Sequence, residues 1–380
     1  MKGLIVLLLI PICLNLEFKI EDEDYLVIPF GGEKRAMKLL IDPMGHFTYI
    51  LRPVISSTME KFKENYNFSN NFGEFEGHWE EDFMFPTKER EFGFKLRYLR
   101  VDKKDTNLDV DGVIGLGYSD HFPDNTNIYK ILSKMKSIFN FKNVMTYDKA
   151  HSKLVLGEVP DFDSFNPVDF DIIPNKVQPV NLVNLTKIGF FDKSTNKVKY
   201  IDINQKAKFG LMPLLVAPKI AKNIMDEIIA NIAQDNSTAK YENNAKKLYQ
   251  DIYFDKSNEN IKPEGIFGFG DIAYKFKHTW NAEGEKPSSS IRFALDDYGD
   301  YWYIGVDKLN INRADFDFDN KKVTMYSTSA YEIGKTKYPY IAVSLLITIT
   351  FASIIAIAIR YCCHKKKQNE IKEGEELAYL

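Results

Sequence analysis

The sequence predicts an all-β protein of two lobes with few short helices, followed by one transmembrane helix near the C-terminus. Short apolar runs broken by Gly, Asn, Asp and Pro fill most of the chain, and this pattern is typical of strands joined by turns. The length of 380 residues exceeds what one compact core usually needs, which favours two lobes. Residues 341–359 carry no charged side chain and are long enough to cross a bilayer as a helix.

The individual elements follow from the same patterns. Aromatic residues make up 14% of the chain, and this excess favours strands that bury a large apolar area. Helices are expected in two places, at residues 127–136 and at residues 219–233, where isoleucines recur at helical spacing. The clearest strands are apolar runs bounded by turn residues, at 27–30, 37–41, 47–51, 92–99 and 153–156.

Both ends of the chain resemble membrane-targeting segments. A single lysine followed by an almost wholly apolar run is typical of a secretory signal peptide, which we expect at residues 1–16. Basic residues follow the apolar stretch 341–359 at once, and basic residues next to a span face the cytosol. We therefore expect a single-pass type I membrane protein of the secretory pathway or cell surface, with a cytosolic tail at residues 360–380.

Charge and modification motifs narrow the function classes further. The net charge of −3 provides no basic field for phosphates, so we expect no nucleic-acid partner. The region between the two ends has no cysteine, so its fold contains no disulfide. Cys362 and Cys363 lie at the inner membrane face and are candidates for palmitoylation, with an unmodified pair as the alternative. Three N-x-S/T sequons are candidates for glycosylation: Asn67, Asn184 and Asn236.

Five segments of the chain, in order, carry recognisable motifs. The first holds Asp42 after an apolar run, and the third reads Asp-Gly-Val-Ile-Gly-Leu-Gly. Together the five segments resemble the pepsin-like aspartic proteases, because the first is similar to that family's first active-site motif and the third is very close to its Asp-Gly-Ile-Leu-Gly-Leu-Gly string. The resemblance implies a bilobal pepsin-like fold with lobes at residues 22–165 and 175–328. The five segments are residues 38–51, 73–83, 111–117, 214–218 and 302–323.

The resemblance also implies a degraded catalytic centre. Members of the family use two facing aspartates that share one proton and activate a water molecule. Asp42 corresponds to the first, but counting back from the fourth segment puts Phe209 at the position of the second. Three further residues correspond to the hairpin that covers the cleft of the family, with Asn70 at the position of its tyrosine: Asn70, Gly73 and Gly77.

Three functions are compatible with these observations. The leading interpretation is a membrane-tethered pseudoprotease that binds a peptide or protein in its cleft without cutting it. The first alternative is a divergent but active aspartic endopeptidase, which requires a second carboxylate facing Asp42. The second alternative is a structural or adhesive surface protein, which predicts a filled groove. The six histidines are scattered, and no metal or cofactor motif is present, so we expect no metal and no cofactor.

Overall fold

The computed structural model describes two compact units, residues 1–331 and residues 332–380. In the second unit residues 348–351 and 353–361 are helical. The described residues are 16–21, 25–86, 93–106, 108–134, 142–160, 167–175, 178–192, 197–212, 214–224, 238–243, 249–255, 264–276, 279–280, 289–290, 293–296, 299–327, 330–332, 348–351 and 353–361.

None of the helices among the described residues is long and apolar enough to cross a membrane. Residues 341–347 of the expected transmembrane segment and the tail beyond residue 361 lie outside the described residues, so both remain predictions. Residues 1–15 of the expected signal peptide also lie outside them. Leu16, its expected last residue, is the buried first residue of a strand.

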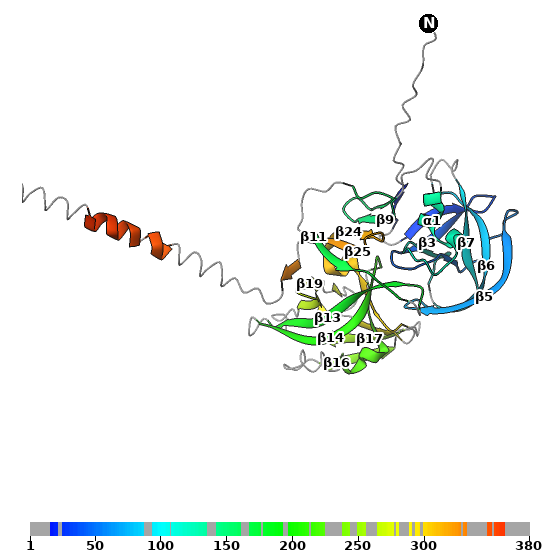
Figure 1. The fold of residues 1–380 in the computed structure, drawn as a ribbon. Coiled ribbons are helices and arrows are strands. Elements are labelled where there is room, and N and C mark those ends of the chain that lie inside the picture. The colour runs from blue at the N-terminus through cyan, green and yellow to red at the C-terminus, as the bar shows by residue number, and fades with distance from the viewer. Residues whose placement is uncertain are drawn as a thin grey trace, which may run out of the picture. The chain divides into compact units, whose positions relative to one another are not determined.

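The first unit is built almost entirely from strands, which confirms the all-β class. Its first sheet has seven strands and comes wholly from the N-terminal part of the chain. It appears in blue and cyan in Figure 1. In spatial order its strands are β2 (Tyr25–Phe30), β3 (Arg35–Asp42), β8 (Gly112–Gly115), β4 (Tyr49–Ile50), β7 (Phe94–Asp105), β6 (Gly73–Met84) and β5 (Glu60–Asn70).

The second large sheet has eleven strands and comes from the C-terminal part, including the green strands β13 and β14 of Figure 1. Its path is β16 (Thr238–Asn243), β17 (Tyr249–Asp255), β22 (Phe293–Asp296), β15 (Leu215–Pro218), β23 (Trp302–Gly305), β14 (Lys197–Gly210), β13 (Asn181–Asp192), β18 (Glu264–Phe269), β19 (Ile272–Phe276) and β26 (Ala330–Glu332), with β12 (Ile173–Pro174) beside β13. A separate pair joins β20 (Thr279–Trp280) to β21 (Ser289–Ser290).

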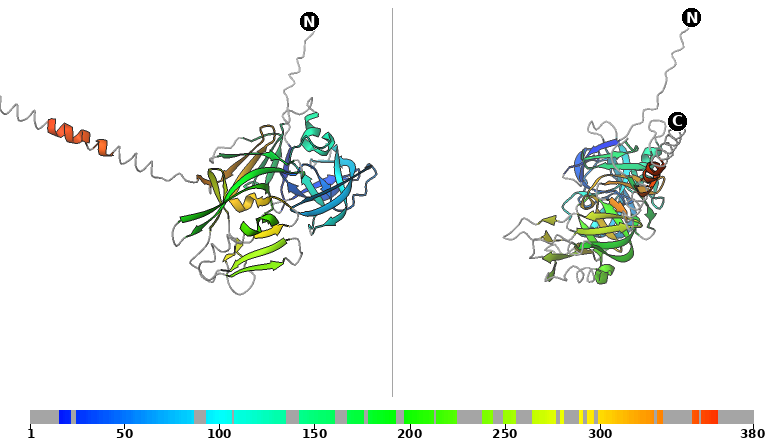
Figure 2. Two further views of the ribbon diagram at one scale, coloured as in Figure 1. Left: turned by 60° about the horizontal axis from the view of Figure 1, so that its bottom comes forward. Right: turned by 90° about the vertical axis from the view of Figure 1, so that its left-hand side faces the viewer.

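A third sheet of six strands combines both parts of the chain. The two further views in Figure 2 show the blue and green parts side by side. The antiparallel pairing of β9 with β24 joins residues that are far apart in sequence, so this sheet ties the two parts together. In spatial order its strands are β1 (Leu16–Lys19), β10 (Lys153–Leu156), β9 (Val144–Asp148), β24 (Ile311–Asp317), β25 (Lys322–Ser327) and β11 (Pro167–Asp171).

The same four-strand arrangement occurs once in each large sheet. In the first, β3 runs parallel to β8, β8 antiparallel to β4, and β4 parallel to β7. In the second, β14 and β23, β23 and β15, and β15 and β22 repeat these three relations. Asp42 pairs with Gly115 in the first arrangement, and Gly210 pairs with Gly305 in the second. Asp42 and Gly210 therefore occupy equivalent positions.

The two glycines that end β8 and β23 explain why these strands carry the Gly-rich motifs. A Cβ on Gly115 would lie 2.2 Å from the carbonyl oxygen of Phe47, and one on Gly305 would lie 2.1 Å from that of Met212. Only glycine permits such a close approach of two backbones. Each glycine thus lets the turn after β3 or β14 pass directly over the neighbouring strand.

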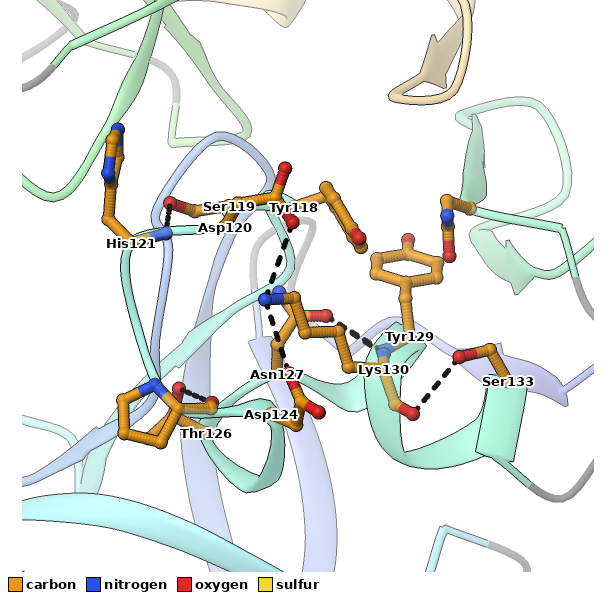
Figure 3. Close-up of polar contacts among 12 residues, drawn as sticks. Tyr118, Ser119, Asp120, His121, Asp124, Thr126, Asn127, Tyr129, Lys130 and Ser133 are labelled. Carbon is orange, nitrogen blue, oxygen red and sulfur yellow. Dashed lines mark hydrogen bonds and ion pairs between the residues drawn. The ribbon is translucent and has the colours of Figure 1, made fainter.

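Helices are few, as expected, and 3₁₀ turns occur at Asp124–Thr126, Lys219–Ala221 and Val306–Leu309. The helix predicted at 127–136 is α1 (Ile128–Lys134). Asn127 caps it, because its Oδ1 accepts the N–H groups of Tyr129 and Lys130 at 3.0 and 3.2 Å (Figure 3). Such a cap contributes about 1 kcal/mol to stability. Of the helix predicted at 219–233, residues 225–233 lie outside the described residues.

Two apolar clusters form the core of the first unit. The larger one extends over both parts of the chain and includes Leu39, Phe209 and Trp302. The smaller one lies beneath the β5–β6 hairpin and is dominated by aromatic side chains. In it the ring of Phe47 contacts the rings of Tyr66, Phe68, Trp79 and Phe122 at centroid distances of 5.0–5.7 Å. These contacts hold the hairpin against β4.

Candidate functional site

Asp42 is the last residue of β3 and is only 3% exposed. Its Oδ1 accepts the backbone N–H of Gly45 at 2.9 Å and that of Met44 at 3.3 Å. A carboxylate that accepts such bonds fixes the turn that follows the strand. The side chain is therefore held rigidly, with its second oxygen left for another partner.

That second partner is Lys208, a residue that sequence reasoning missed. Its Nζ lies 2.5 Å from Asp42 Oδ2, and the two side chains are 1% and 4% exposed. Lys208 lies on β14, so this salt bridge joins the two large sheets. Removing one member of such a buried pair typically costs about 3–5 kcal/mol, because the other charge is left without compensation. The pair is thus a rigid feature at the junction of the two parts.

The position equivalent to Asp42 in the second arrangement is Gly210, and a tyrosine takes up the adjacent space. A Cβ on Gly210 would lie 2.0 Å from the hydroxyl oxygen of Tyr303. This hydroxyl also accepts the backbone N–H of Met212 at 3.2 Å. Asp42 makes the corresponding contact with Met44 at 3.3 Å. A neutral phenol therefore supports the turn in one half where a carboxylate supports it in the other.

Phe209 does not lie opposite Asp42, which corrects the position expected from sequence spacing. Its side chain is fully buried and packs against the rings of Phe170 and Phe269, at centroid distances of 6.1 and 5.5 Å. Side chains alternate between the two faces of a strand, so Lys208 and Gly210 share the face that Phe209 does not. The count back along the sequence from the fourth segment therefore went one residue too far.

The tip of the β5–β6 hairpin lies over the salt bridge. Asn70, expected at the cleft, donates from Nδ2 to the hydroxyl of Tyr49 at 3.2 Å and accepts the N–H of Phe72 at 2.8 Å. Asn71 donates to the carbonyl oxygen of Tyr301 at 3.5 Å, which connects the tip to the other half of the molecule. All three residues of the tip, Asn70 to Phe72, are buried.

Phe72 fills the space above the pair. Its ring lies 5.9 Å from the ring of Tyr303 in an edge-on arrangement. Lys208 Nζ lies 5.2 Å from the centre of the Phe72 ring and 6.0 Å from that of Tyr303. A desolvated cation above an aromatic ring is worth about 2 kcal/mol. Phe72, a second residue that sequence reasoning missed, therefore closes the site with a side chain of the protein itself.

The space that remains beside Asp42 is small. A cavity of about 10 Å³ lies between Asp42, Asn70, Tyr49, Lys208 and the loop at Val180. One water molecule needs roughly 10–15 Å³ of such space, so the cavity does not admit a peptide. Burial raises the pKa of the Tyr49 hydroxyl well above its ordinary value, so the phenol stays protonated. In this conformation the cleft is filled.

His46, near the same turn, has a structural role. It is 1% exposed, and its Nε2–H donates to Asn181 Oδ1 at 3.2 Å. Asn181 in turn donates from Nδ2 to the carbonyl oxygen of Tyr118 at 3.2 Å. Burial lowers the pKa of His46 to about 4, although the bond to Asn181 opposes this shift. The ring is therefore neutral at neutral pH.

The other candidates are scattered. Gly73 lies in the hairpin turn with φ of +136°, whereas Gly77 lies further along β6 and does not line the cavity. Asn67 and Asn184 are exposed on β5 and β13. Three candidates, Asn236, Cys362 and Cys363, lie outside the described residues. No group of three metal-ligating side chains occurs within the described part of the chain.

A comparison of the chain with models of known protein families found no match. A search of curated proteins found no match either.

Proposed function

We propose that this chain is a membrane-tethered, non-catalytic relative of the pepsin-like aspartic proteases that binds a peptide or protein. Four features of the fold support the relationship. The four-strand arrangement is repeated, Asp42 ends the strand where the family has its first aspartate, and a six-stranded sheet joins the two parts. The fourth feature is the hairpin that covers the site, as the second of the five resembling segments implies.

The salt bridge between Asp42 and Lys208 is the observation that carries the non-catalytic part of the proposal. The family reaction needs one ionised and one protonated carboxyl group that share a proton and hold a water between them. Here the ammonium group of Lys208 donates a hydrogen bond to Oδ2 of Asp42. At the position equivalent to Asp42 there is a glycine, and Tyr303 fills the space beside it. Among the described residues that line the cavity, Asp42 has the one carboxylate, so the two-carboxylate mechanism lacks its second member there.

Binding in the cleft requires the hairpin tip to lift. A ligand has to displace Phe72 from Tyr303 and Lys208, and exposing a phenylalanine side chain costs about 2 kcal/mol. An extended peptide that supplies its own aromatic side chain recovers much of this cost. The measured dissociation constant then equals the intrinsic one divided by the fraction of open molecules. Affinity for such a peptide is therefore set partly by how firmly the tip is held.

The filled cavity favours a second candidate, a structural or adhesive surface protein that uses its outer faces. A cleft with room for about one water presents no groove to a peptide. In that case partner binding survives substitutions at Phe72 and Asp42, whereas cleft binding responds to both. The proposed pseudoprotease and the surface protein are thus separated by one pair of variants.

Peptide cleavage tests the proposal directly. The purified protein is incubated with a peptide library across about pH 3 to 7, the range in which carboxylate pairs titrate. An active pepsin-like protease serves as the positive control, and the Asp42→Asn variant is assayed alongside. We expect no cleavage by either form of this protein. Turnover by the wild type that disappears in Asp42→Asn refutes the proposal and supports a divergent active endopeptidase.

A further inference from the structure

A larger hollow lies on the hairpin and shares one lining residue, Phe68, with the cavity beside Asp42. It has a volume of about 490 Å³ and is lined by β5, β6 and β7. This volume falls within the range of about 300–1,000 Å³ that is typical of small-molecule sites. Two rows of paired residues cross it, one formed by Asn67, Glu76 and Lys103 and the other by Ser69, Glu74 and Asp105.

Asn67 and Ser69, which begin these rows, are the two defining residues of a sequon. Asn67 is exposed, and its side-chain amide makes no hydrogen bond within the described residues. The sequon of Asn184 differs. The amide oxygen of Asn184 accepts from Lys206, and the hydroxyl of Thr186 donates to the carbonyl oxygen of Gly268. The sequon of Asn67 lines the hollow with both of its defining residues, Asn67 and Ser69.

The position of Asn67 on the sheet gives a glycan there a physical role. β5 is the edge strand of the seven-stranded sheet, and unpaired strand edges promote association with other chains. Exposed Lys61 and Lys63 protect the first half of the strand, because charged side chains oppose edge-to-edge pairing. From Asn65 to Asn70 the strand carries no charged residue. This second half needs another form of cover.

We propose that Asn67 carries an N-linked glycan whose inner sugars lie in this hollow and cover the uncharged half of β5. The proposal rests on the proposed function insofar as it requires passage through the secretory route. A lipid diphosphate-linked oligosaccharide is the donor. The bond from its first sugar carbon to the phosphate oxygen breaks, and a bond from that carbon to Asn67 Nδ2 forms. The lipid diphosphate leaves with the electron pair of the broken bond and takes up the proton that Nδ2 loses.

The lining suits sugars in particular. The carboxylates of Glu74, Glu76 and Asp105 accept hydrogen bonds from hydroxyl groups, and the ammonium of Lys103 donates to sugar oxygens. Lys103 and Glu76 already pair at 3.0 Å on the exposed surface. Because exposed pairs are worth only about 0–1 kcal/mol, a sugar hydroxyl exchanges with them at little cost. The rings of Phe68 and Phe75 line the hollow together with its polar side chains, which matches the mixed surface of a pyranose.

The test expresses the full chain in eukaryotic cells that perform N-glycosylation and examines each sequon by glycopeptide mass spectrometry. We expect a glycan on Asn67, and loss of one glycan-sized step in mass in both Ser69→Ala and Asn67→Gln. Thr186→Ala, the matched hydroxyl-to-methyl change in the sequon of Asn184, leaves the Asn67 glycan unchanged. Digestion with an endoglycosidase that cuts the glycan core then compares the native and the denatured protein. We expect release from Asn67 to be at least tenfold slower in the native protein.

The outcomes separate this proposal from its premise. An unmodified Asn67 overturns it, and glycans found at the other sequons in the same sample show that the secretory premise still holds. A glycan on Asn67 that is released equally fast from native and denatured protein refutes the proposal that its inner sugars lie in the hollow. Slow native release that becomes fast when Glu76→Ala and Lys103→Ala are combined supports the contacts proposed here.

Discussion

The salt bridge between Asp42 and Lys208 makes a quantitative prediction about stability. Lys208→Met removes the ammonium and leaves the buried carboxylate of Asp42 without its partner. Breaking a buried pair in this way should lower the free energy of unfolding by about 3–5 kcal/mol. Asp42→Asn keeps an oxygen that accepts the N–H groups of Met44 and Gly45 but leaves Lys208 without a counter-charge. We expect a loss of similar size from this second variant.

The double variant Asp42→Asn/Lys208→Met provides the control. It removes both charges, keeps the backbone hydrogen bonds and preserves the volume, and such replacements of buried pairs are often neutral. We expect it to lie within about 1–2 kcal/mol of the wild type, so that the coupling energy between the two sites is at least about 4 kcal/mol. Urea unfolding of the purified protein measures all four forms. Additive losses, or single variants that lose less than about 1 kcal/mol, would refute the assignment of a buried, coupled pair.

Two further predictions concern the cleft and the buried histidine. Phe72→Ala should open the hairpin tip and speed amide hydrogen exchange in β5 and β6. It should also raise the affinity for aromatic peptides by about thirtyfold, because the cost of about 2 kcal/mol for displacing the Phe72 side chain is removed. Unchanged hydrogen exchange would contradict a tip held by this ring. His46 has a pKa of about 4 in the folded protein, below its ordinary value of 6.5, so the unfolded chain binds more protons between these pH values. Stability should therefore fall by up to about 3 kcal/mol as pH drops from about 6.5 to 4, and His46→Gln should flatten this part of the urea-midpoint profile.

The sequence predicted the β class, five of the strands (β2, β3, β4, β7 and β10) and the place of Asp42 at the end of an apolar run, because these depend on local patterns. Apolar runs and turn residues are sufficient to place strands such as β3 and β10. The Asp-Gly-Val-Ile-Gly-Leu-Gly string identifies β8, since its last strand residue must be glycine for the turn at Phe47 to pass. Such constraints act on a few neighbouring residues and therefore leave a signal that a single sequence contains.

The partner of Asp42 could not be found in the same way. Asp42 and Lys208 are 166 positions apart and lie in different sheets, so only the tertiary structure brings the lysine to Asp42. One signal was present, because a lysine beside Phe209 and Gly210 in an apolar segment has to be exposed or paired. A count of residues back from the fourth segment assumes that the turns after β3 and β14 are equally long. It therefore could not detect that the two turns differ by one residue. The register of the parallel strands, Gly210 with Gly305, resolves it.

The internal repeat gives the most demanding test of how this site differs from a pair of carboxylates. Lys208, Gly210 and Tyr303 are equivalent to Leu40, Asp42 and Val113, because the two strand pairs share one register. The triple variant Lys208→Leu/Gly210→Asp/Tyr303→Val therefore copies the first half of the site into the second.

Two carboxylates should then face each other, and like charges at a few Å cannot both ionise without a large cost. We expect the triple variant to be more stable near pH 4 than near pH 7, because one of its carboxyl groups must stay protonated in the folded state. The variant that keeps Gly210, Lys208→Leu/Tyr303→Val, serves as its control and separates the new pair from the unpaired Asp42. Equal pH profiles for the two variants would show that residue 210 does not face Asp42. A steeper loss toward neutral pH in the triple variant would identify Lys208 and Tyr303 as the side chains that now occupy the place of the second carboxylate.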